Sequence, residues 1–208
     1  MKKNLFIAFE GIDGCGKSTQ VKLLTKHLQD SGHRVYETFE PTDSEIGLMI
    51  RKIFRHDIEA DHRTIAALFI ADRIHHVTNK QNGIIKKLNE GYTVICDRYC
   101  LSSYAYQGIH VPIDWVIKAN SISTDLLRPD LNIYIDITPE QSMQRLHQGR
   151  ENLEMYETIE NLTQVRNMYE LVIEKLKNTE NIFITDGNRS EAEVFDSIKS
   201  AIDNLTNH

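Results

Sequence analysis

Short apolar runs alternate along the chain with longer stretches in which apolar residues recur every three or four positions. Each run predicts a buried strand, because a strand covered on both faces is apolar without strict alternation. The periodic stretches predict amphipathic helices. The predicted strands cover residues 5–9, 34–39, 92–96, 131–137 and 181–185.

The helical stretches follow the strands in turn. The first begins after Ser18 and ends near Gly32, which can take the left-handed conformation of a helix C-terminus. Thr138 and Pro139 are typical of an N-cap and a first helical residue. Further helices are predicted at residues 44–54, 62–90, 99–106, 113–122, 157–178 and 190–205.

Strands separated by helices indicate an α/β fold in which a five-stranded parallel sheet has helices on both faces. Ligands of such sheets bind at the carboxyl ends of the strands. A chain of 208 residues fits a single domain, so we expect residues 1–208 to form one domain.

The loop after the first strand, FEGIDGCGKSTQ (residues 9–20), has the strongest chemical signal. Gly11, Gly16, Lys17 and Ser18 match G-x-x-x-x-G-K-[ST] between a strand and a helix, which predicts a phosphate loop over residues 11–18. Backbone N–H groups and the helix N-terminus would bind phosphate, the lysine would reach the β- and γ-phosphates, and the serine would contact Mg²⁺. The fold is therefore predicted to be a three-layer sandwich of the P-loop NTPase type.

The net charge and the cysteine content restrict the classes of ligand and the cellular compartment that we expect. The formal net charge of −6 argues against a broad nucleic-acid surface. Three cysteines are few and odd in number, which favours reduced thiols in a cytoplasmic protein. No apolar stretch reaches bilayer length. We expect small-molecule ligands, no nucleic acid and no membrane.

Charged residues follow two other strands. Glu40 and Pro41 come directly after the second strand, where the proline stiffens the turn. Asp97 and Arg98 come directly after the third. The aspartate could hold a water on Mg²⁺, and the arginine could bind a phosphate through its planar fork of donors. A structural ion pair or an ordinary loop is the alternative.

The helix after the third strand carries Ser102, Ser103, Tyr106 and Gln107. These hydrogen-bonding side chains would face the predicted pocket, and a glutamine can both donate to and accept from a pyrimidine edge. Taken singly, each is more often an ordinary surface residue.

Phe69 and Arg73 are four residues apart on a predicted helix, so they share one face. A ring for stacking beside a fork of donors suits a nucleobase. The alternative is a core phenylalanine with a surface arginine.

The stretch QRLHQGRENLEMYE (residues 144–157) has no clear apolar face and carries Arg145 and Arg150. We expect a short lid over about residues 145–156, since a mobile cover over transferring phosphates needs cations and low local stability. A solvated loop is the alternative.

In these motifs the chain resembles the thymidylate kinase family, nucleoside monophosphate kinases that move the γ-phosphoryl group of ATP to dTMP. The segments that carry the resemblance appear in the family's order. They are FEGIDGCGKSTQ, EPTD, LFIADR, DRYCLSSYAYQG and RPDL.

For ATP, the resemblance implies Mg²⁺ held by Ser18 and, through a water, by Asp97. Catalysis would depend on Asp13, Lys17, Arg98 and Arg150. The ATP site would comprise Gly11, Asp13, Gly14, Cys15, Gly16, Lys17, Ser18, Thr19 and Arg145.

For dTMP, the resemblance implies that Phe69 stacks on thymine, Arg73 donates to its O4 and Arg98 binds the phosphate. Asp13 would lie near the 3′-hydroxyl, and Tyr106 would close on the 2′ face of the sugar. Ser102, Ser103 and Gln107 would line the base site, beside Glu40 and Pro41. The resemblance also implies a homodimer.

Two positions depart from the family pattern. Some members carry an arginine inside the phosphate loop where this chain has Gly14, so Arg150 of the lid is the first candidate for the γ-phosphate. Many members have an arginine just after the proline of the second-strand loop, where this chain has Thr42 and Asp43.

Two other functions remain open from the sequence. One is a kinase for another nucleoside monophosphate or a deoxynucleoside. The other is a P-loop regulatory module without catalysis, although N-K-x-D, a motif for nucleotide specificity, is absent.

Overall fold

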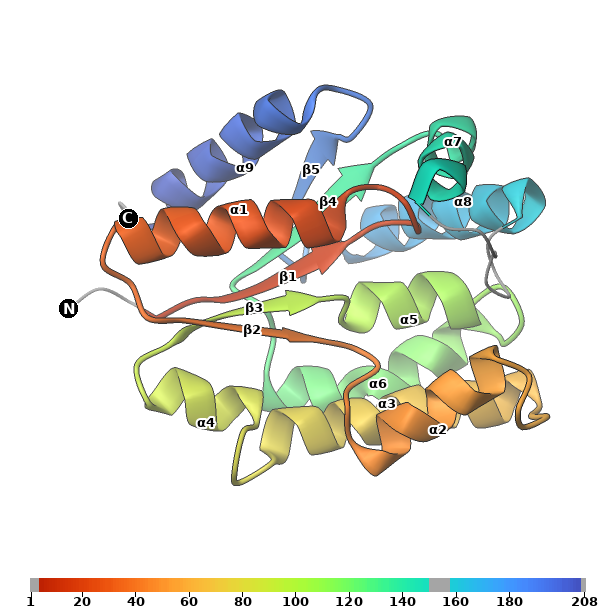
Figure 1. The fold of residues 1–208 in the computed structure, drawn as a ribbon. Helices are drawn as coiled ribbons and strands as arrows, with labels where there is room; N and C mark the ends of the chain where they lie inside the picture. Colours follow the sequence, from red (N-terminus) through yellow and green to blue (C-terminus); the bar gives the residue numbers. More distant parts are fainter. Residues whose placement is uncertain (1–3, 150–157, 207–208) are drawn as a thin grey trace.

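Five parallel strands form the centre of the molecule, in the order β2-β3-β1-β4-β5 (Figure 1). The computed structural model describes residues 4–149 and 158–206. All five predicted strands are confirmed to within one residue at each end. Their bounds are β1 Phe6–Glu10, β2 Val35–Phe39, β3 Thr93–Asp97, β4 Leu131–Asp136 and β5 Ile182–Asp186.

Strand β1 lies between β3 and β4 and is buried along its whole length. Ala8 pairs with Cys96 on one side and with Asn132 on the other. The edge strands β2 and β5 are only partly buried. The unbroken apolar sequence of β1 is therefore the consequence of its central place.

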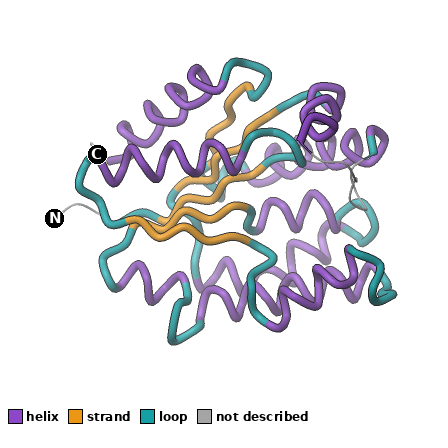
Figure 2. The backbone as a smooth tube through the Cα atoms, in the orientation of Figure 1, coloured by secondary structure: helices purple, strands orange, loops and turns teal. Residues whose placement is uncertain are grey.

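Helices cover both faces of the sheet, as the sequence predicts (Figure 2). Helices α1 and α9 pack together over one face, and α3, α4 and α6 cover the other. Helix α5 packs against α8, and α2 lies outside α3. The bounds are α1 Lys17–Asp30, α2 Glu45–Phe54, α3 His62–Thr78, α4 Ile84–Asn89, α5 Cys100–Gln107, α6 Ile113–Leu126, α7 Pro139–Gly149, α8 Ile159–Leu176 and α9 Glu191–Thr206.

The single helix predicted over residues 62–90 is wrong, because the structure has α3 and α4 there. The side-chain oxygen of Asn79 accepts bonds from two backbone N–H groups just beyond α3, and Gly83 is the N-cap of α4. An asparagine that binds nearby backbone competes with the helix. Val77 and Ile84 are both buried seven residues apart, so the apolar period continues across the break and conceals it.

Helix α7 begins as predicted. The Thr138 hydroxyl accepts a bond from the backbone N–H of Gln141, and Pro139 is the first helical residue. The helix continues to Gly149, so Arg145 is helical. Residues 150–157, which include Arg150 and most of the predicted lid, lie outside the described residues.

The carboxyl ends of β1, β2 and β3 meet at one edge of the sheet, where α1, α2 and α5 follow them through loops (Figures 1 and 2). This edge carries the phosphate loop and both charged strand ends. Among the described helices, none combines the length and apolar character that a bilayer crossing requires.

Candidate active site

The phosphate loop takes a backbone path that requires glycine. Gly11, Gly14 and Gly16 have φ angles of 142°, 73° and 99°. A Cβ atom on Gly11 would lie 2.7 Å from the carbonyl oxygen of Ile135, and one on Gly14 would lie 2.9 Å from that of Ser142. Since only glycine adopts this path without strain or collision, the loop can curl closely before α1.

Lys17, the first residue of α1, is buried inside the loop. Its Nζ donates to the carbonyl oxygens of Gly11 and Ile12, both at 3.1 Å, and contacts Cys15 Sγ at 3.6 Å. The ammonium therefore lies where the loop surrounds an anion, and a phosphate oxygen would replace loop carbonyls as its partner.

A cavity of about 850 Å³ opens beside this loop, and we call it the loop cavity. Of the predicted ATP-site residues, Gly11 and Cys15 do not line it. The Cys15 side chain is buried in the core instead. Arg145 reaches the loop cavity from α7 and donates to the carbonyl oxygens of Gly187 at 2.8 Å and Cys15 at 3.4 Å. The predicted residues that line it are Asp13, Gly14, Gly16, Lys17, Ser18, Thr19 and Arg145.

Ser18 and Asp97 meet in the loop cavity. The Ser18 hydroxyl donates to Asp97 Oδ2 at 3.0 Å. The other oxygen, Oδ1, is buried without a hydrogen-bond partner among the described residues. A hydroxyl beside an unsatisfied carboxylate oxygen fits Mg²⁺, which prefers hard oxygen ligands and keeps several waters.

A second cavity, of about 250 Å³, lies between α2, α3 and α5, and we call it the helix cavity. All ten predicted dTMP-site residues line it: Asp13, Glu40, Pro41, Phe69, Arg73, Arg98, Ser102, Ser103, Tyr106 and Gln107. Gln107 Oε1 is buried there without a hydrogen-bond partner in the described part of the chain. This oxygen can therefore accept a hydrogen bond from an N–H group of a ligand.

Sequence reasoning missed four residues of the helix cavity: Arg51, Phe54, Arg55 and Tyr99. Arg51, Phe54 and Arg55 come from α2 and its C-terminus, at positions i, i+3 and i+4. That spacing places the three residues on one helix face, and it is the feature of the sequence from which they could have been predicted. The Phe54 and Phe69 rings lie 6.0 Å apart and form an apolar wall.

Arg98 occupies the strained turn between β3 and α5, with a φ of 71°. This region is uncommon for residues other than glycine, and such strain concentrates at functional sites. Nη1 donates to Gly11 O at 3.0 Å and to Ser102 Oγ at 3.1 Å. Nη2 donates to Asp13 Oδ1 at 2.6 Å and to Tyr106 OH at 3.2 Å. These four bonds hold the guanidinium between the phosphate loop and α5.

Asp13 is the carboxylate that faces Arg98 from inside the phosphate loop, and it also accepts a bond from the Tyr106 hydroxyl at 2.8 Å. Burial by itself would raise the pKa of Asp13. The positive charges of Arg98 and Lys17 outweigh that effect and lower the pKa of Asp13 below its usual value.

Glu10, at the end of β1, lies fully buried beneath this turn and was also missed. Its carboxylate accepts bonds from the Tyr99 backbone N–H at 2.9 Å, the Ser102 hydroxyl and the Tyr169 hydroxyl at 3.1 Å. Burial raises the pKa of Glu10. The signal for it was an acidic residue that ends an otherwise apolar strand.

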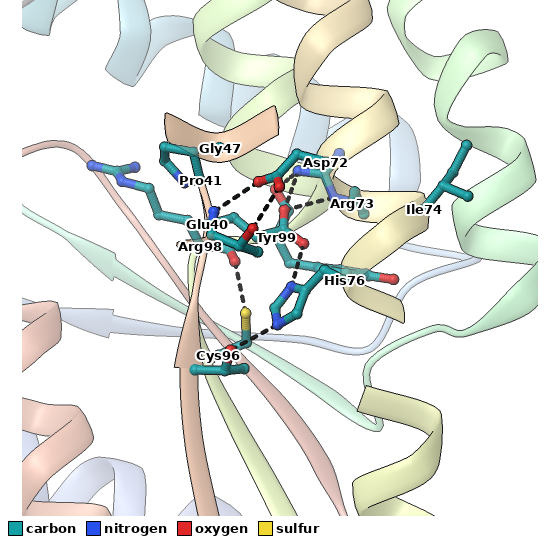
Figure 3. A network of polar contacts seen from close by, with 12 residues as sticks. Glu40, Pro41, Gly47, Asp72, Arg73, Ile74, His76, Cys96, Arg98 and Tyr99 are labelled. Carbon is teal, nitrogen blue, oxygen red and sulfur yellow. Dashed lines mark hydrogen bonds and ion pairs between the residues drawn. The ribbon is translucent and has the colours of Figure 1, made fainter. Parts of the chain in front are cut away.

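Arg73 and Glu40, which both line the helix cavity, form a buried ion pair (Figure 3). Arg73 is only 1% exposed. Its Nε donates to Glu40 Oε2 at 2.8 Å, Nη1 donates to Asn120 Oδ1, and Nη2 donates to Tyr99 O and Ser103 Oγ. One N–H of Nη1 is left without a partner among the described residues, so Arg73 has little freedom in how it can meet a ligand.

Glu40, His76 and Cys96 bring possible metal-ligand atoms within 4.8 Å of one another. A cation there would take Glu40 from Arg73 and leave a buried guanidinium without its carboxylate, which is costly. Burial also raises the pKa of Cys96 well above its usual value, which disfavours a thiolate ligand. We therefore interpret the cluster as a hydrogen-bond network.

The two cavities are adjacent and share part of their lining. Five residues line both of them: Asp13, Glu40, Pro41, Arg51 and Arg98. The Arg51 guanidinium donates to the carbonyl oxygens of Pro41 at 2.5 Å and Thr42 at 2.8 Å. Two arginines therefore stand where anionic ligands in the two cavities would approach each other.

Comparisons with known proteins agree with this geometry. The family model described as thymidylate kinase matches residues 9–198. A thymidylate kinase of Caldicellulosiruptor saccharolyticus is 38% identical over 207 residues, 98% of each chain. One of Thermosipho africanus is 38% identical over 204 residues, 96% of this chain and 98% of that protein. A probable thymidylate kinase of Pyrococcus horikoshii is 40% identical over 173 residues, 80% of this chain and 82% of that protein.

The lowered pKa of Asp13 predicts a pH-dependent stability difference between the wild type and an Asp13→Asn variant. A carboxyl whose folded pKa is lowered stabilises the folded state above its unfolded pKa, near 3.8, and loses that contribution as pH falls through the folded pKa. The wild type should exceed the variant in unfolding free energy at pH 7, and the difference should shrink below about pH 4.

Urea unfolding at pH 7, 5, 4 and 3 measures this difference. Asp30→Asn is the control, since Asp30 is 66% exposed and pairs with Lys26 on the surface. A difference between wild type and Asp13→Asn that stays constant from pH 7 to pH 3 would contradict the prediction.

Proposed function

The chain belongs to the thymidylate kinase family and is an ATP-dependent dTMP kinase, and we propose that the loop cavity binds ATP while the helix cavity binds dTMP. The observation that carries the proposal is the rim of five residues that the two cavities share. An acceptor phosphate and the γ-phosphate of ATP can meet only where the two cavities are continuous.

ATP would place its phosphates in the phosphate loop at the N-terminus of α1. Lys17 would exchange its bonds with loop carbonyls for bonds with the β- and γ-phosphates. Ser18 and Asp97 would hold Mg²⁺, the aspartate through a water. The bound ion would neutralise charge on the β- and γ-phosphates.

dTMP would place its base in the helix cavity, against Phe69. Gln107 Oε1, which is buried and unsatisfied, would accept the N3–H of thymine. The remaining N–H of Arg73 would donate to O4. Asp13 would lie near the 3′-hydroxyl, and Tyr106, which already bonds to it, would close the 2′ side of the sugar.

Arg98 and Arg51 would together bind the phosphate of dTMP. Arg51 would supply the cation that many relatives place just after the proline of the second-strand loop, where this chain has Thr42 and Asp43. Its bonds to two carbonyls of that loop fix it beside Pro41. Bidentate arginine suits phosphate geometry, and two such groups would set the acceptor's orientation.

The transfer itself requires alignment of two reactants and stabilisation of charge on the moving group. The phosphate oxygen of dTMP is ionised near neutral pH, so no strong general base is needed. Lys17 and Arg98 would stabilise the charge from opposite sides. Arg150 lies outside the described residues, and its role on the γ-phosphate remains a prediction.

We expect two copies of the chain to form a homodimer in which α6 of each copy lies at the interface. Trp115, Ile122 and Leu126 are 44%, 57% and 45% exposed. They are seven and four residues apart, so they form one apolar face of α6, beside α3. An apolar helix face of this kind is typical of a protein interface.

The acceptor preference tests the proposed function. ADP release should be fastest, by kcat/KM, with dTMP among dTMP, dUMP, dCMP, dGMP and AMP, and chelation of Mg²⁺ should abolish it. A Lys17→Ala variant should be slower by about 10²-fold or more, which excludes a contaminating kinase. The proposal fails if dTMP is not among the best acceptors.

The role of Arg51 gives a second prediction. An Arg51→Ala variant should raise the KM for dTMP by about ten- to a hundredfold, because it loses a charge-assisted contact worth ~1.5–3 kcal/mol. The KM for ATP should change far less. Arg55→Ala is the matched control, since Arg55 lines only the helix cavity. Equal effects of the two variants on dTMP would remove Arg51 from phosphate binding.

The dimer gives a third prediction. An Ile122→Glu variant places a charge at the centre of the apolar face of α6 and should convert the dimer to a monomer, which sedimentation equilibrium measures. Lys26→Glu is the control, since the Lys26 side chain is 75% exposed on α1 and lies outside the proposed interface. A wild type that sediments as a monomer refutes the dimer, and an Ile122→Glu variant that stays dimeric refutes this interface.

A further inference from the structure

His76 lies in the network behind the helix cavity, three residues after Arg73 on α3 (Figure 3). It is 7% exposed. Its Nδ1 lies 3.0 Å from Glu40 Oε1, and its Nε2 lies 2.7 Å from Thr38 Oγ1. The imidazole therefore bridges β2 and the carboxylate that pairs with Arg73.

The partners of the ring decide which nitrogen carries the proton. An ionised carboxylate only accepts hydrogen bonds, so Nδ1 must donate to Glu40. In the neutral ring Nε2 is then the acceptor, and the Thr38 hydroxyl donates to it. With this tautomer, the hydrogen bonds run in one direction, from Thr38 through His76 to Glu40.

Each oxygen of Glu40 has a separate partner. Oε2 lies 2.8 Å from Nε of Arg73 and 2.6 Å from its Nη2, whereas Oε1 accepts from His76. Donors on both oxygens fix the plane of the carboxylate. Without the donor on Oε1, the carboxylate could rotate about its last bond, and the geometry of the Arg73 pair would change with it.

Arg73 depends on that geometry, because one N–H of Nη1 remains for a ligand and the others are engaged within the described part of the chain. We propose that His76 is a positioning residue for base recognition: it fixes the Glu40 carboxylate, which aims the remaining N–H of Arg73 at the oxygen on C4 of the base. The proposal rests on the proposed function, in which the helix cavity binds dTMP.

Substitutions that copy one ring nitrogen at a time test it. An asparagine amide nitrogen lies near the place of Nδ1, and a glutamine amide nitrogen lies near that of Nε2. His76→Asn should keep the donor to Glu40, whereas His76→Gln and His76→Leu should lose it. His75→Leu is the matched control, since His75 is exposed on the same helix and contacts Asn79.

The expected result is a change in recognition rather than a uniform loss. His76→Gln and His76→Leu should raise the KM for dTMP about tenfold, with the KM for ATP within about twofold, while His76→Asn and His75→Leu stay near wild type. The ratio of kcat/KM for dTMP to that for dCMP, which has an amino group on C4, should fall at least about fivefold in the glutamine and leucine variants only.

A role in stability alone would lower the melting temperature and the active fraction but leave the KM for dTMP and the acceptor ratio unchanged, and this result overturns the proposal. Asparagine and leucine variants with the same recognition defect would also overturn it. If the leucine variant does not fold, the KM for dTMP and the acceptor ratio of the glutamine variant test the proposal alone. Wild-type enzyme that fails to phosphorylate dTMP in this assay refutes the proposed function instead.

Discussion

Two arginines are held largely out of water at the carboxyl edge of the sheet, and each is stable there only because a carboxylate from another strand end lies against it. Arg98 is paired with Asp13 of the phosphate loop, and Arg73 with Glu40 after β2. A buried charge without a partner would cost several kcal/mol, roughly 3–5 by the usual effect of removing one partner. The pairs that would recognise the nucleotide therefore also hold the structure together. The Arg98–Asp13 pair joins the turn before α5 to the phosphate loop, and the Arg73–Glu40 pair joins α3 to the end of β2.

The parallel topology makes these pairs possible. Because β1, β2 and β3 run in the same direction, their ends and the residues after them arrive at a common edge. Arg98, in a left-handed turn, then reaches back over β1 to Gly11 and Asp13. The sheet thus converts three sequence-distant loops into one rigid site, in which residues on α5 and α3 complete the walls.

Much of this arrangement could be predicted from the sequence, for physical reasons. The strands are apolar because both faces are covered, and the phosphate loop has a local motif whose glycines the backbone requires. The break between α3 and α4 was hidden by an apolar period that continues through it. The spacing of Arg51, Phe54 and Arg55 placed them on one face of α2, but it could not show that this face lines the helix cavity, because that depends on how α2 packs against α3. The spacing placed Phe69 and Arg73 on one helix face. It could not show that most N–H groups of Arg73 form hydrogen bonds with other groups of the protein.

The shared rim of the loop cavity and the helix cavity has a consequence for inhibitor design. Asp13, Arg51 and Arg98 line both cavities, so a single compound with an adenosine at one end and a thymidine at the other would join its two halves across this shared rim, where two arginines suit an anionic linker. Once the first half is bound, the second half would be present at an effective concentration in the millimolar range or above, provided that the linker spans the rim without slack. The shared lining that would bring the two nucleotides together thus also makes the enzyme a target for bivalent ligands.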